Sequence, residues 1–314
     1  MTRKGIERGE KSEMKIGLVD VDGRVIRGKS RNGERYPNLV LMKLSAWHKA
    51  KGDNVEFAMP LVKYDRIYMS KIFTTSPDER TAWLCDDVRR GGTGYGVTAK
   101  DRLPEEVEHM RPDYSLYGVA DTAYGFLTRG CPRGCPFCVV TEKEGYASQK
   151  VADLKEWWNG QKEIKLLDPN ILACSKWREL FGQLIESRAK IDFTQGLDIR
   201  LMTEEKAKMI VACKVKMLHF AWDGKEDLEE RFKVYAERFK HLRSGHRLRA
   251  YMITNFDTTH EWDMHRVRVL DSLGYDPFVM VYDKKNAPLI TRRLQRWVNN
   301  KAVFRTVKKF KDYK

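Results

Sequence analysis

The sequence has no long hydrophobic run and little cysteine. No stretch of about 18 consecutive apolar residues occurs in its 314 residues, so no transmembrane helix is predicted. The N-terminal stretch MTRKGIERGEKSEMKIGLVD lacks the apolar core of a signal peptide. Six cysteines do not make the disulfide framework of a secreted protein, and a reducing compartment leaves them free for metal or catalysis. We therefore expect a soluble, cytoplasmic protein that makes no contact with membranes.

Acidic residues are scarce relative to basic ones. The chain carries 59 Lys and Arg against 44 Asp and Glu, for a net charge of +15. Residues 289–314 concentrate this excess, with nine basic side chains and a single acidic one, Asp312. Such a segment favours a polyanion, such as a nucleic acid, or an acidic protein as its partner. A solvated surface helix without a partner is the alternative.

Residues 14–100 follow the pattern of a small α/β domain. The apolar run MKIGLVDVDG (14–23) predicts a buried strand, and YPNLVLMKLSAWHKAKGDN (36–54) predicts a helix that stops at Gly52. Further strands are predicted from VEFAM, YDRIYMSKIF and TAWLCDDV (81–88), and a glycine loop, RRGGTGYGV (89–97), follows them. We predict a doubly wound, Rossmann-like domain after an N-terminal extension (1–13), with ligand loops at the carboxyl ends of its strands.

The second half of the chain repeats a strand-then-helix pattern six times. A polar, proline-bearing linker over 101–120 precedes it. The first strand, AYGFLTRG (123–130), leads directly into a group of cysteines. Consecutive βα units predict parallel strands that curl into an open barrel, with chemistry at their carboxyl ends. We predict a partial (β/α)6 TIM-type barrel over 121–288, and a basic C-terminal helix and tail over 289–314.

Three cysteines, Cys131, Cys135 and Cys138, lie close together in TRGCPRGCPFC (128–138). Thiolates at this spacing favour zinc or an iron–sulfur cluster. A structural zinc site is closed by four protein ligands, and no second cysteine pair is present. The remaining cysteines are isolated in the sequence: Cys85, Cys174 and Cys213. Three cysteines would leave one iron of a [4Fe–4S] cluster open to a substrate or cofactor.

The CxxxCxxC motif after a first barrel strand, with the aromatic Phe137 before its third cysteine, resembles the radical S-adenosylmethionine (SAM) superfamily. The resemblance implies that Cys131, Cys135 and Cys138 hold a [4Fe–4S] cluster, and that SAM chelates its open iron. Reductive cleavage of SAM then yields a 5′-deoxyadenosyl radical that abstracts hydrogen from a substrate, here unidentified. A flavodoxin- or ferredoxin-type electron donor is also implied. A metal-stabilised, zinc or iron–sulfur, nucleic-acid-binding protein without radical catalysis stays open as the alternative.

The order of the domains resembles the branch of that superfamily with a cobalamin-binding-type (B12-binding-like) N-terminal domain. The helix at 36–54 and the loop GGTGY (91–95) look like that domain's first helix and glycine loop. The family's cobalamin-ligating segment, Asp-x-His-x-x-Gly, has no counterpart, because the matching loop DVDGRVIRGKSRNG (20–33) lacks histidine. We expect a domain that caps the barrel without cobalamin, with Gly92 and Thr93 at the substrate pocket.

The resemblance also places SAM contacts at the strand ends by position. Asp168, in LLDPN, is expected to pair with the SAM ammonium, with Asn170 beside it. In TQGLDIR, Arg200 is expected to bind the SAM carboxylate with bidentate geometry. Gln195 and Asp198 are expected near the ribose. Gln195 and Arg200 can both point inward only if a bulge forms at Gly196.

The last three strand ends complete the predicted site. Phe137 and, near the adenine, Asn255 are expected to contact the cofactor. The residues expected to line the substrate pocket, besides the glycine loop, are Trp222, Asp223, Tyr282 and Asp283. For Tyr282, burial in the core is the alternative.

Overall fold

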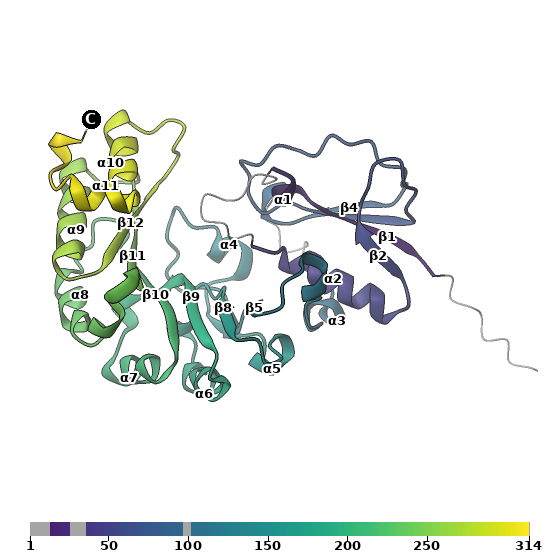
Figure 1. Cartoon of the computed structure of the whole chain (residues 1–314), viewed down its shortest axis with the longest axis horizontal. Helices are drawn as coiled ribbons and strands as arrows, with labels where there is room; N and C mark the ends of the chain where they lie inside the picture. Colours follow the sequence, from purple (N-terminus) through teal and green to yellow (C-terminus); the bar gives the residue numbers. More distant parts are fainter. Residues whose placement is uncertain (1–12, 26–35, 97–101, 314) are drawn as a thin grey trace, which may run out of the picture. The chain divides into compact units, whose positions relative to one another are not determined.

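The computed structural model describes residues 13–25, 36–96 and 102–313, so part of the loop at 20–33 and most of the N-terminal extension lie outside the described residues. The chain divides into two compact units, Met1–Ala120 and Asp121–Lys314 (Figure 1). Each unit has its own all-parallel sheet flanked by helices, which confirms the predicted α/β class. No helix among the described residues is long and apolar enough to cross a membrane.

The first unit contains a four-stranded sheet in the order β2-β1-β3-β4. Its strands are β1 (Lys15–Asp20), β2 (Asn54–Phe57), β3 (Arg66–Ser70) and β4 (Val88–Gly91). The short helix α1 (Val21–Val25) follows β1, and α2 (Leu39–Ala50) leads into β2. The side chain of Asn38 caps α2 by accepting a hydrogen bond from the Leu41 N–H.

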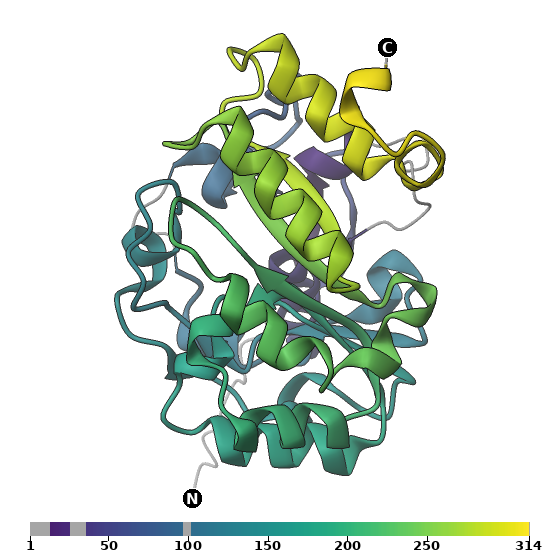
Figure 2. The same ribbon diagram turned by 90° about the vertical axis from the view of Figure 1, so that its left-hand side faces the viewer.

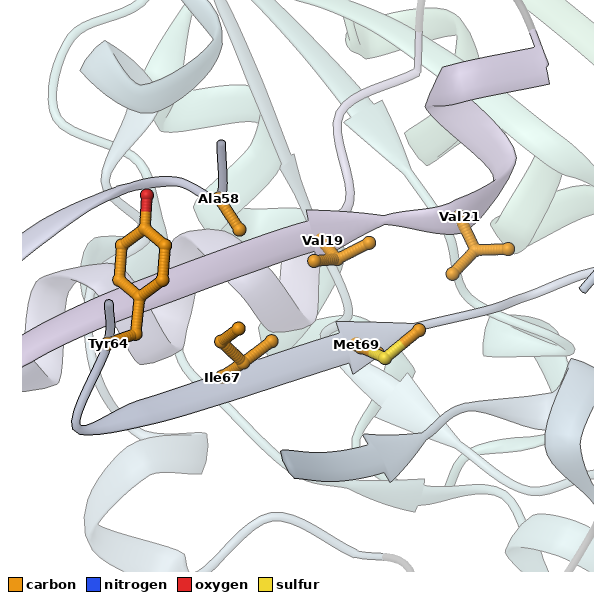
Figure 3. Close-up of a cluster of buried hydrophobic side chains, with 6 residues drawn as sticks. All are labelled: Val19, Val21, Ala58, Tyr64, Ile67 and Met69. Carbon is orange, nitrogen blue, oxygen red and sulfur yellow. The ribbon is translucent and has the colours of Figure 1, made fainter. Parts of the chain in front are cut away.

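Alternate residues of β1 face two different apolar layers, as expected of a strand buried on both sides. Ile16 and Leu18 pack against Leu41 and Leu44 of α2. On the other face a second cluster forms, shown in Figure 3: Val19, Val21, Ala58, Tyr64, Ile67 and Met69. The central position of β1 in the sheet therefore follows from its nearly continuous apolar sequence.

The fourth strand lies later in the chain than the sequence predicts. TAWLCDDV (81–88) is largely irregular, and within it Leu84 makes a single bridge to Lys63. The strand β4 instead takes in the arginines of the predicted glycine loop, and the loop begins at Gly92. Trp83 and Cys85 are partly buried against the second cluster, so packing rather than strand pairing accounts for the apolar residues of this segment.

Residues 102–120, predicted as a linker, pack against α2. The short helix α3 (Glu105–Glu108) buries Val107 in the α2 layer. Asp113 accepts hydrogen bonds from Ser45 Oγ and Lys49 Nζ, both at 2.7 Å. The 3₁₀ turn Tyr114–Tyr117 carries Tyr117, whose hydroxyl donates to Asp20 at 2.7 Å. The segment is thus an integral part of the first unit.

The second unit contains a six-stranded sheet whose order in space, β12-β11-β10-β9-β8-β5, is the order in the chain. The strands are β5 (Thr122–Gly125), β8 (Glu163–Leu166), β9 (Lys190–Leu197), β10 (Val215–Ala221), β11 (Leu248–Thr254) and β12 (Asp276–Val281). Consecutive parallel neighbours are the arrangement predicted for an open (β/α)6 barrel. All carboxyl ends meet at one end of the sheet, called the carboxyl end below.

Helices follow the strands in regular alternation. They are α5 (Leu154–Trp157), α6 (Trp177–Ser187), α7 (Glu204–Ala212), α8 (Glu229–Ala236), α9 (His260–Ser272) and α10 (Leu289–Asn299). Figure 2 shows the green helices side by side over one face of the sheet. Phe220 of β10 contacts Phe232 of α8 across this interface, with ring centroids 6.2 Å apart. Thr203 caps α7, with its side chain accepting a hydrogen bond from Lys206 N.

The basic C-terminal segment folds onto the second unit. Helix α10 packs on β12, and α11 (Lys301–Thr306) follows it. Trp297 donates from Nε1 to the Val307 carbonyl at 2.8 Å, and its ring contacts Phe304 and Phe310. These aromatic side chains therefore bind the tail to α10.

Candidate functional site

The three clustered cysteines lie in a closed loop that follows β5. We call residues 126–150 the cysteine loop. Its ends pair as two short antiparallel strands, β6 (Thr128–Arg129) and β7 (Gln149–Lys150), and α4 (Val140–Glu144) lies between them. Gly130 has a φ of 85°, and a β-carbon there would collide with the Ala147 carbonyl. The cysteines are thereby held at the carboxyl end of the sheet.

Asp168, which follows β8, holds the base of this loop. Its buried carboxylate accepts hydrogen bonds from Leu127 N at 3.2 Å, Thr128 N at 2.5 Å and Thr128 Oγ1 at 2.7 Å. Burial raises its pKa to about 6, although these hydrogen bonds act in the opposite direction. Both carboxylate oxygens accept bonds from the chain. The carboxylate thus stabilises the cysteine loop, and its expected contact with the SAM ammonium stays a prediction.

Asn170 touches the first cysteine of the motif. Its Nδ2 lies 3.5 Å from Cys131 Sγ, and the residue is only 2% exposed. Its Oδ1 is buried and makes no hydrogen bond to any described residue. A buried acceptor without a donor is costly unless a ligand or water supplies one. Asn170 is therefore placed to accept a hydrogen bond from a group bound beside Cys131.

Cys131 and Cys135 are partly buried and Cys138 is exposed, and charged side chains lie near Cys135 and Cys138. Cys138 N donates to the Cys135 carbonyl at 2.9 Å, which turns the chain between these two cysteines. Burial raises the pKa of both Cys135 and Cys138. Arg133 and Arg200 lie near Cys135 and oppose this shift of its pKa. Metal binding at these thiols would therefore have to displace protons.

Zinc and a [4Fe–4S] cluster place different demands on the positions of their cysteine ligands. Within residues 13–25, 36–96 and 102–313, no group of three or more His, Cys, Asp or Glu side chains is placed to hold a metal ion. A single zinc draws its thiolates to within roughly 4 Å of each other, since each Zn–S bond is about 2.3 Å. A [4Fe–4S] cluster gives each cysteine a separate iron, so its ligands surround a larger body.

A network of charged side chains connects the cysteine loop with the ends of β9 and β10. Arg200 donates from Nε to Asp198 Oδ1 at 2.6 Å and from Nη1 to Glu226 Oε2 at 3.0 Å. Arg133, between the first two cysteines, lies 3.7 Å from Asp198 Oδ2 and 3.6 Å from Glu226 Oε2. Asp198 Oδ2 is buried and makes no hydrogen bond to a described residue. Arg133 and Glu226 were not singled out from the sequence.

The structure has the bulge expected at Gly196. Gly196 has a φ of 90°, and the β9–β10 register shifts between Phe193 and Leu197. The shift brings Asp198 and Arg200 into the charged network described above. Gln195 is exposed, so the structure does not bring it together with them.

The expected pocket residues Trp222 and Asp223 have different surroundings. Trp222 is fully buried, stacks on Phe232 and donates from Nε1 to the Glu226 carbonyl at 2.8 Å. It is a core residue, and its prediction as a pocket wall is not supported by this packing. Asp223 Oδ1 accepts from Ile253 N at 2.8 Å, and burial raises its pKa. Its charge also raises the pKa values of Cys135 and Cys138, which places it near the cysteine loop.

Three aromatic rings connect the cysteine loop with the ends of β11 and β12. Phe137 contacts Phe256 with ring centroids 5.2 Å apart, and Phe256 contacts Tyr282 at 4.9 Å. Tyr282 is 42% exposed and so is not a core residue. Asn255 donates from Nδ2 to the Tyr282 carbonyl at 2.9 Å. Phe256 was missed from the sequence, although its place directly after β11 marked it as a carboxyl-end residue.

The loops after β11 and β12 adopt an uncommon backbone conformation. Asn255, Asp257 and Asp283 have φ values of 63°, 53° and 43°. Asn and Asp tolerate the left-handed region better than most residues, and such conformations are frequent at functional sites. Asp283 also accepts from Asn286 Nδ2 at 2.9 Å, so its side chain stabilises its own turn.

In the first unit, the glycine loop is explained by close packing on Lys71. Gly92 has a φ of 101°, and a β-carbon there would collide with the Lys71 carbonyl. Gly94 N donates to the same carbonyl at 2.8 Å, and Thr93 begins the 3₁₀ turn Thr93–Tyr95. The expectation that Gly92 and Thr93 meet the substrate stays a prediction.

No family model matches this chain, and no curated protein matches it.

Proposed function

We propose that this protein is a radical SAM enzyme in which Cys131, Cys135 and Cys138 hold a [4Fe–4S] cluster. The observation that carries the proposal is three thiols on one loop at the carboxyl end of six consecutive parallel strands. When bound, the cluster and SAM supply a 5′-deoxyadenosyl radical after one-electron reduction. A flavodoxin- or ferredoxin-type protein of a reducing cytoplasm would supply that electron.

The unsatisfied groups around the cysteine loop support a bound SAM. We assign the SAM ammonium to Asn170 Oδ1 rather than to Asp168, because Oδ1 is buried, lacks a donor and adjoins Cys131. Asp198 Oδ2 is the second buried acceptor and suits a ribose hydroxyl. Arg133 is added to Arg200 as a candidate for the SAM carboxylate, because both lie near Cys135.

The aromatic and acidic residues at the ends of β10 to β12 support the substrate side of the site. Phe137, Phe256 and Tyr282 form a continuous set of ring contacts that would limit access of water to the cluster. Asp223 is a buried carboxyl near the cysteines, and burial raises its pKa. We propose that it and Tyr282 face the substrate. We assign no cobalamin to the first unit.

Metal analysis tests this proposal. Protein purified without oxygen should contain about four irons per chain, the content of one [4Fe–4S] cluster, and little zinc. Alanine at Cys131, Cys135 or Cys138 should remove the iron. Cys213→Ala is the matched control, because this thiol is buried in the core and far from ionisation at neutral pH, with a pKa of about 12. Stoichiometric zinc in place of iron would overturn the proposal.

A further inference from the structure

A groove of about 650 Å³ runs between α9 and the C-terminal segment. We call it the α9 groove. One wall is α9, and the other is formed by residues 304–311, with Trp297 of α10 between them. Figure 1 shows α9, α10 and α11 gathered at the end of the second unit. Its volume falls within the range of roughly 300–1,000 Å³ that is usual for ligand pockets.

The walls of the α9 groove carry an excess of positive charge. Arg268 of α9 and Lys308, Lys309 and Lys311 of the tail are exposed cations. None of these four side chains has an ion-pair or hydrogen-bond partner among the described residues. The groove contains only two carboxylates, from Glu261 and Asp271. Unpaired cations on both walls favour an anionic ligand that contacts both.

Aromatic rings lie between these charged walls. Phe310 contacts His260 at 5.2 Å and Trp297 at 5.5 Å, measured between ring centroids. Trp297 is only 3% exposed, whereas Phe310 is half-buried and lines the groove. The Nδ1 atom of His260 is buried and has no hydrogen-bond partner among the described residues. Cations beside an aromatic face are the combination that binds single-stranded nucleic acid.

The groove begins at the carboxyl end of the six-stranded sheet. Its first lining residue, His260, opens α9, which follows β11. Phe256, in the connection between them, contacts Phe137 of the cysteine loop. A flexible chain lying in the groove can therefore continue toward the cysteine loop.

We propose that the α9 groove binds single-stranded nucleic acid. Arg268 and the three lysines hold phosphates, and Phe310 with His260 offers a face for one base. A concave, aromatic-lined groove suits a polynucleotide better than an acidic protein, which docks through a broader surface. The groove would bind nucleic acid whether or not the cysteine loop carries a cluster.

Binding of fluorescein-labelled oligouridylate and oligothymidylate, followed by anisotropy without SAM or reductant, tests the groove alone. Deletion of the tail would not test the groove alone. It would also remove the ion pair of Lys301 with Asp276 and the hydrogen bond that the Val307 carbonyl accepts from Trp297, both of which hold the segment in place. We therefore compare Lys308→Gln/Lys309→Gln/Lys311→Gln with a control that removes the same charge from exposed, unpaired lysines elsewhere. The control variant is Lys176→Gln/Lys190→Gln/Lys214→Gln.

The groove variant should bind the labelled oligonucleotides roughly tenfold more weakly than the control variant does. The slope of log K against log salt concentration should become shallower by about 0.7 for each lost phosphate contact. Arg268→Gln, on the opposite wall, should weaken binding independently of how the tail folds. Absence of binding by the intact protein, or equal losses in groove and control variants, would overturn the proposal. It would equally be overturned if the groove variant kept its nucleic-acid affinity and lost only flavodoxin-driven SAM cleavage, which would assign the surface to an acidic protein.

Discussion

The two ends of the six-stranded sheet differ in how completely their buried polar side chains are hydrogen-bonded. At the amino end, Asp276 begins β12 and pairs with Lys301 at 2.7 Å and with Arg249 at 3.1 Å. At the carboxyl end, Asn170 Oδ1 and Asp198 Oδ2 are buried without a hydrogen bond to any described residue. Folding alone satisfies the first set, whereas the second set leaves buried acceptors that a ligand or water can satisfy. The difference separates residues that stabilise the sheet from residues whose polar atoms are free to bind a ligand.

The largest expected effect on folding is at the amino end. Asp276→Ala removes the shared partner of Arg249 and Lys301, each about one quarter exposed. Because it leaves partly buried cations unpaired, we expect a loss of about 3 kcal/mol in the free energy of unfolding, measured with urea. Asp121→Ala is the control, because its ion pair with Lys162 is exposed and should contribute less than about 1 kcal/mol. Equal effects of the two substitutions would remove the contrast between the ends.

Asp168 sharpens the comparison because it lies at the carboxyl end with its carboxylate already hydrogen-bonded. Burial raises its pKa to about 6 in the folded protein, from 3.8 for an aspartate in the unfolded chain. Between pH 4 and 6 the unfolded chain releases this proton while the folded chain keeps it, so the free energy of unfolding falls as pH rises. The expected loss is about 2–3 kcal/mol. Asp168→Asn should abolish this part of the pH dependence. If the free energies of unfolding of the wild-type protein and the variant differ by a constant amount from pH 4 to 6, the assignment is contradicted.

Asn170 tests the unsatisfied acceptor directly. Asn170→Ala should weaken SAM binding by about 1.5–3 kcal/mol, the range for a hydrogen bond to a charged group, measured by equilibrium dialysis of the iron-loaded protein. Iron content should not change. The exposed Asn159→Ala in the same unit is the control. An unaltered dissociation constant for SAM would place the ammonium elsewhere.

Much of the second unit could be predicted from the sequence because its signals are local. Each strand is a short apolar run, each helix follows it, and caps such as Thr203 mark the boundaries. A bulge is present at Gly196, but Gln195 is exposed, so an inward-facing pair of Gln195 and Arg200 does not account for it. In the first unit β4 was misplaced, because Trp83 and Cys85 are apolar for packing rather than for strand pairing.

The site was harder to predict than the fold, because its pairs join distant loops. The contacts of Arg133 with Asp198 and Glu226 depend on how three loops meet, which no local pattern encodes. Trp222 and Asp223 are adjacent in the chain, yet one packs into the helix layer and the other lies near the cysteines. Position at a strand end placed the predicted residues at the carboxyl end of the sheet. It did not identify which side chains remain unsatisfied there.

The measurement that tests the central claim most directly is cleavage of SAM. The protein is reconstituted with iron and sulfide under anaerobic conditions, mixed with SAM and dithionite, and assayed for 5′-deoxyadenosine by chromatography. The account predicts 5′-deoxyadenosine with the intact protein and with Cys213→Ala, and none with Cys135→Ala. A reconstituted protein that carries a full iron complement and yields no 5′-deoxyadenosine would contradict it.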